Sequence, residues 1–151
     1  DLLSSQAKAK GQDGFLATLK GPVVQALLTH ADDRALRETV YAAYNTRASD
    51  QGPHAGQFDN SDRIARILAL RHEAAQLLGF ASAAHESLED KMAGSPERVL
   101  GFLRELAAKA RPVAMRELDE LRAFASTELR LHDLQPWDVA YASEKLRVAR
   151  Y

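Results

Sequence analysis

The residues that come closest to a catalytic motif are His72 and Glu73, within the stretch RHEAAQ at residues 71–76. In the zinc-binding motif H-E-x-x-H, two histidines four residues apart project from one helix face to a single metal ion, and the glutamate activates a water molecule. Here Gln76 takes the place of the second histidine, and an amide is a poor zinc ligand. The other four histidines are scattered along the chain. The sequence therefore predicts no metal ligand and no catalytic residue.

A helical wheel gives Arg71 and His72 a structural role instead. At about 100° per residue, Arg71 falls in the middle of the apolar face of its helix and His72 at the edge of that face. The apolar residues of this face are Ile64, Ile67, Leu68, Ala75 and Leu78. A guanidinium removed from water needs carboxylate or carbonyl partners. We therefore expect Arg71 and His72 to be buried, with Arg71 paired to an acid or to backbone carbonyls. Glu117 raises the same question on the apolar seam of a later helix.

The polar residues best placed to contact a ligand or another lobe lie in or just before the one long loop, residues 49–60. They are Arg47, Asp50, Gln51 and His54. A loop of this length without secondary structure is often functional or mobile. The commoner alternative is a polar connection on the surface, and the sequence leaves both readings open.

The composition predicts that helices position these residues. Of the 151 residues, 27 are Ala and 21 are Leu, whereas Val, Ile and Thr together number only 14. Ala and Leu are strong helix formers, and so few β-branched residues cannot furnish a sheet. We expect an all-α fold, an antiparallel and bundle-like set of helices joined by short loops.

Caps and breaking residues place the helices along the chain. We expect helices over residues 2–10, 22–30, 34–48 and 61–78, a short helix after residue 82, a long helix from residue 96, and a last one to residue 151. The only plausible extended piece is residues 15–19. The apolar pattern from Val99 continues in phase through Pro112, which predicts one long helix kinked near Pro112. Both ends stop within helical patterns, so we expect one helical segment, residues 1–151, truncated at both ends.

Several classes of function are disfavoured. The chain has no cysteine, so it has no thiol nucleophile and no thiolate metal site. Its formal net charge of -1 offers no basic field for nucleic acid or anionic lipid. The apolar runs are far shorter than the ~20 residues of a membrane span. We therefore expect neither nucleic acid nor a membrane as a partner.

Several stretches, in order along the chain, resemble a known enzyme family. They include YNTRASDQGP at residues 44–53, ILALRHE at 67–73, LLGF at 77–80, KMA at 91–93, ARP at 110–112 and LQPWD at 134–138. Together they resemble the thimet-oligopeptidase-like M3 metallopeptidases along essentially the whole chain. The TRASDQGP stretch and the QPWD turn are similar to the oligopeptidase branch rather than to the peptidyl-dipeptidases.

The resemblance implies a mostly helical, two-lobed enzyme of the cytoplasm that hydrolyses short peptides with one zinc ion. The zinc motif of the family lies C-terminal to the part that this chain resembles, so His72 and Glu73 inherit no catalytic role. We expect the chain alone to bind no zinc and to be inactive. The alternative is a free-standing helical binding or scaffold module without enzymatic activity. Apolar faces left open by truncation would promote self-association, for which we expect the first or last helix to be used.

Overall fold

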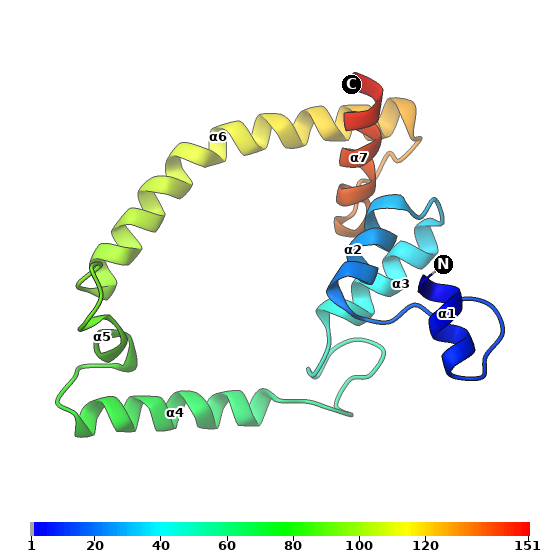
Figure 1. Cartoon of the computed structure of the whole chain (residues 1–151). Helices are drawn as coiled ribbons and strands as arrows, with labels where there is room; N and C mark the ends of the chain where they lie inside the picture. The colour runs from blue at the N-terminus through cyan, green and yellow to red at the C-terminus, as the bar shows by residue number, and fades with distance from the viewer. Residues whose placement is uncertain (1) are drawn as a thin grey trace. The chain divides into compact units, whose positions relative to one another are not determined.

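The computed structural model describes residues 2–151 and is built from helices (Figure 1). In chain order they are α1 (Leu2–Ala9), α2 (Gly21–His30), α3 (Arg34–Asn45), α4 (Ser61–Leu77), α5 (Ala83–Leu88), α6 (Pro96–Glu128), the 3-10 helix η1 (Pro136–Asp138) and α7 (Val139–Arg150). Among these residues there is no strand, and residues 15–19 are irregular. The all-α class is confirmed.

Local chemistry explains where the helices begin and end. Pro22 lies in the first turn of α2, where its missing N–H costs nothing. The carboxylate of Asp33 accepts hydrogen bonds from the backbone N–H groups of Ala35 and Leu36 and so caps α3. Gly79 follows α4 with a φ of 86°, the left-handed conformation that commonly ends a helix. These positions agree with the signals in the sequence.

The long helix α6 continues through Pro112, as its unbroken apolar phase predicts. Proline removes one backbone N–H from the helical ladder and crowds the preceding turn. A helix of this length tolerates the defect because the bonds on either side remain. The ribbon of α6 is curved along this stretch (Figure 1).

The chain divides into two compact units where the sequence predicts one segment. Unit 1 comprises the residues up to Phe58 together with Leu121–Tyr151, and unit 2 comprises Asp59–Glu120. In unit 1, α2 packs against α3 and α7, and the end of α6 contributes to a core with α7. The buried members of that core are Leu121, Ala125 and Ala142. In unit 2, α4 packs on α5, and Ala75 is the buried residue of α4.

Candidate functional site

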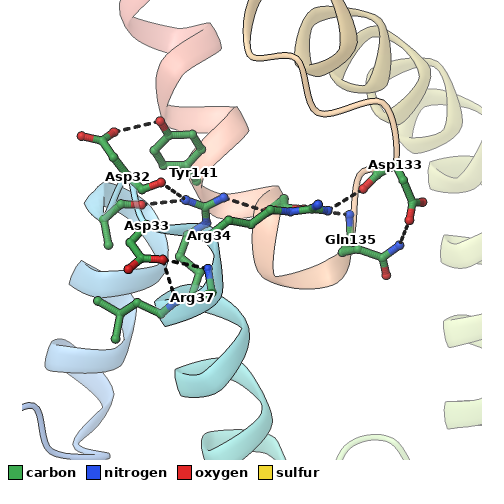
Figure 2. A network of polar contacts seen from close by, with 11 residues as sticks. Asp32, Asp33, Arg34, Arg37, Asp133, Gln135 and Tyr141 are labelled. Atoms are coloured by element: carbon green, nitrogen blue, oxygen red, sulfur yellow. Dashed lines mark hydrogen bonds and ion pairs between the residues drawn. The ribbon is translucent and has the colours of Figure 1, made fainter.

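The most connected polar group of unit 1 is the carboxylate of Asp138, which is fully buried (Figure 2). Arg37, also buried, donates from Nη2 to Asp138 Oδ1 at 2.7 Å. Arg34 donates from Nη2 and Nε to Oδ2 at 2.8 and 3.1 Å. The backbone N–H of Gln135 adds a bond of 3.1 Å to the same oxygen. One carboxylate therefore joins α3 to η1 with two guanidinium groups around it.

Backbone carbonyls satisfy the remaining donors of the two arginines. Arg37 Nη1 donates to the carbonyl oxygen of Ala31 at 2.7 Å, and Arg34 Nη2 donates to that of Asp133 at 2.8 Å. The guanidinium of Arg37 also lies 4.1 Å from the ring centroid of Tyr141, a cation–π contact with α7. This is how the fold accommodates a buried arginine, whose charge needs both a counter-ion and hydrogen-bond acceptors.

An outer layer of the same network involves Asp32. The hydroxyl of Tyr141 donates to Asp32 Oδ1 at 2.8 Å, and Lys145 Nζ lies 3.3 Å from that oxygen. These two hydrogen bonds hold the pKa of Asp32 below its ordinary value. Burial, followed by the bond to Asp32, raises the pKa of Tyr141. Asp32 is exposed, so this layer is screened by solvent and weaker than the buried one.

The network is built for structure rather than for proton transfer. Burial by itself raises the pKa of Asp138, but the hydrogen bonds from Arg34 and Arg37 outweigh it, and the pKa lies below its ordinary value. A carboxylate held ionised and enclosed by donors cannot act as a general acid or base near neutral pH. We therefore assign Asp138, Arg34 and Arg37 to holding α3, η1 and α7 together.

Acid should weaken unit 1 through Asp138. An aspartate whose pKa is lowered in the folded state stabilises fully above the unfolded pKa of about 3.9 and loses that contribution as the pH falls through the folded pKa. We expect unit 1 to lose stability below about pH 4. The fluorescence of Trp137, the single tryptophan, should report this transition. The D138N variant should lack this part of the pH dependence, and an acid transition as steep as that of the unmodified chain would contradict the assignment.

The loop residues singled out in the sequence are not gathered around this network. Arg47 donates from Nε to the carbonyl oxygen of Tyr44 at 3.0 Å and from Nη1 to that of Leu19 at 3.2 Å. It also stacks over the Tyr44 ring at 4.0 Å, so its guanidinium joins α3 to the segment before α2. Asp50, Gln51 and His54 are exposed. A ligand or lobe contact through these residues stays a prediction.

The loop is nonetheless ordered by local contacts. Ser49 Oγ donates to the carbonyl oxygen of Thr46 at 2.8 Å and accepts from the N–H of Gln51 at 3.1 Å. Gly52 has a φ of 81°, and a Cβ placed on it would overlap the Thr46 side chain. The glycine is therefore needed for both its backbone conformation and the close approach of the loop to α3.

Two glycines of this loop offer a matched test of that requirement. G56A should cost about 1 kcal/mol, because Gly56 is left-handed at 74° but has open space around it. G52A should cost about 0.5–1 kcal/mol more, because Thr46 must also shift. Urea unfolding followed by Trp137 fluorescence measures both variants. Equal losses would show that the contact with Thr46 has no energetic weight.

Arg71 and His72 are exposed in the structure, in contrast to the burial that the helical wheel predicts. The wheel identified an apolar face correctly but carries no information on what covers it. In unit 2, α4 is packed on α5 around Ala75, and the rest of that face is open. Arg71 lines a polar cavity of about 560 Å³ with Glu86, Ser87, Asp90 and Lys91. A structural pairing of Arg71 with an acid stays a prediction.

The sequence reasoning missed the Arg34–Arg37–Asp138 network. One signal was available, because Arg37 precedes Val40 by three residues and so shares its buried helix face. The partner could not be found in the same way, since Asp138 is 101 residues away along the chain. Among residues 2–151, no group of three or more His, Asp or Glu side chains that could hold a metal ion is found. Within the same range, no helix has the length and apolar character needed to cross a bilayer.

Comparison with known proteins defines the class. The model of peptidase family M3 matches residues 27–151, and the chain belongs to this family. The chain is 56% identical over 147 residues to Oligopeptidase A of Salmonella typhimurium and 54% identical over 147 residues to Oligopeptidase A of Escherichia coli. Each match covers 97% of this chain and 22% of the relative.

A more distant relative places the chain within the family. Dipeptidyl carboxypeptidase of Escherichia coli is 33% identical over 151 residues, a match covering 99% of this chain and 22% of that protein. The higher identity to the two proteins named Oligopeptidase A confirms the oligopeptidase branch indicated by the sequence. The chain spans about a fifth of the length of these relatives.

Proposed function

We propose that this chain is part of a zinc-dependent oligopeptidase that hydrolyses short peptides in the cytoplasm. The observation that carries the proposal is the identity of 56% and 54% to two proteins named Oligopeptidase A over 97% of the chain. Membership in family M3 favours this function over a free-standing scaffold module. The role of the chain itself is to supply ordered helices, with α3, η1 and α7 fixed by the buried Asp138 network.

A segment exchange tests the proposal. Residues 3–149 of this chain would replace the matched segment in Oligopeptidase A of Escherichia coli, to which it is 54% identical over 147 residues. We expect the chimaera to fold and to hydrolyse a fluorogenic peptide within about tenfold of the unmodified enzyme's kcat/KM, a loss of ~1.4 kcal/mol in transition-state stabilisation. A chimaera carrying R37M serves as the control that disturbs the segment's own core. A folded chimaera without activity would overturn the proposal.

The donor set in the described chain does not fit zinc, because no three potential ligands cluster. No catalytic step is therefore assigned to these residues, and we propose that the zinc ligands of the oligopeptidase lie outside them. Calorimetric titration of the chain with zinc at neutral pH should show no stoichiometric binding. One-to-one binding with sub-micromolar affinity would contradict this assignment, whatever the activity of the chimaera.

A further inference from the structure

Helix α4 carries an apolar face that is open along its length. Ile64, Ile67, Leu68 and Leu78 retain 56%, 48%, 62% and 63% of their accessible surface. Arg71 lies at the centre of this face and is itself exposed. We call this surface, made of these five residues, the α4 face. An apolar stripe interrupted by one arginine can be buried at low cost only against a surface that brings a carboxylate to that arginine.

Helix α6 carries a second open face of the same kind within unit 2. Leu103, Leu106, Ala110, Val113 and Glu117 follow one another at steps of three and four residues and so share one side of the helix. Leu103, Leu106 and Val113 are 50%, 52% and 44% exposed, and Glu117 is exposed as well. We call these five residues the α6 face. It has the pattern of the α4 face, with an acid in place of the arginine.

We propose that the α4 face of one copy of this chain docks on the α6 face of a second copy, with Arg71 paired to Glu117. Like-with-like packing of either face would place two arginines or two glutamates together, which like-charge repulsion opposes. Packing the α4 face on the α6 face compensates both charges as they leave water. Because each copy carries both faces, the contact occurs twice in a symmetric dimer. This assigns self-association to α4 and α6 rather than to the first or last helix.

Charge reversal tests the pairing in the complete 151-residue chain. Sedimentation equilibrium should show a concentration-dependent monomer–dimer equilibrium. R71E alone and E117R alone should each weaken the association constant by about tenfold or more, because each sets like charges in contact. The double variant should recover the association constant of the unmodified chain to within about threefold, since the pair is restored with its polarity reversed.

A mixture of the two single variants gives a sharper test. In a dimer of one R71E chain and one E117R chain, both contacts join opposite charges, so an equimolar mixture should dimerise although neither variant does so well alone. R66E and E105R are the matched controls, because Arg66 and Glu105 lie on the far sides of the same helices. Alone or mixed, these controls should leave the association constant within about twofold.

The outcomes separate this dimer from other occupants of the two faces. A monomer at all concentrations would overturn the proposal and leave the faces to another occupant, such as a different segment of a longer polypeptide. A dimer unaffected by R71E and E117R would equally overturn it, since the pairing would then be absent from the interface. Circular dichroism of each variant should match that of the unmodified chain, so that a loss of association reports the interface and not unfolding.

Discussion

D138N is expected to lower the free energy of unfolding of unit 1 by about 3–5 kcal/mol, because it breaks a buried ion pair while leaving one charge in place. The guanidinium of Arg37 is 1% exposed and keeps its charge when the carboxylate is replaced by an amide. An amide presents one acceptor oxygen where two guanidinium groups and the N–H of Gln135 now bind. Urea unfolding followed by Trp137 fluorescence measures the loss within unit 1.

Two further variants identify the cause of that loss. D32N makes the same chemical change in the exposed outer layer and should have a much smaller effect, because solvent screens that ion pair. The double variant R37M/D138L replaces both buried charges with apolar side chains and should recover part of the loss, since buried ion pairs are often no more stabilising than well-packed apolar groups. A loss from D32N equal to that from D138N would show that burial is not the source of the effect.

A142L is expected to destabilise unit 1 by about 3 kcal/mol through overpacking. Ala142 on α7 and Ala125 on α6 are both fully buried in the same core, together with Leu121. A side chain with three more carbon atoms cannot enter this contact without moving one helix away from the other. The change is made two helical turns from the single tryptophan or closer, so the same fluorescence measurement applies.

The matched control for this substitution is A149L, on the same helix α7. Ala149 is exposed, so the added carbon atoms meet solvent and the effect should stay within about 0.5 kcal/mol. The two variants carry identical changes in composition and in helix propensity. If A142L and A149L unfolded at the same urea concentration, the tight packing of α6 on α7 in unit 1 would be refuted.

The positions of the helices could be predicted from the sequence because they depend on neighbours in the chain. Asp33 caps α3 through N–H groups two and three residues away, and Gly79 ends α4 by its own backbone conformation. The continuity of α6 through Pro112 followed from apolar residues spaced by three and four. Each of these signals acts within about two helical turns, the range in which sequence patterns carry direct physical information.

The buried polar residues could not be predicted in this way. Arg37 and Arg71 both lie on an apolar helix face, yet Arg37 is buried and Arg71 is exposed. The difference comes from partners distant in sequence, since α7 and η1 bring Tyr141 and Asp138 onto α3. No segment of unit 2 covers the α4 face in the same way. A helical wheel gives the direction of a side chain and not what stands opposite it.

The sequence by itself thus determined the helical class, the helix boundaries and membership in family M3, because propensity, capping and order of motifs are properties of the linear chain. Only the tertiary structure decided which charges are buried and which surfaces remain open. Asp138 became the centre of unit 1 because two arginines about a hundred residues away converge on it. The cost of burying a charge depends on partners supplied by the fold, and that dependence is the physical reason for the division.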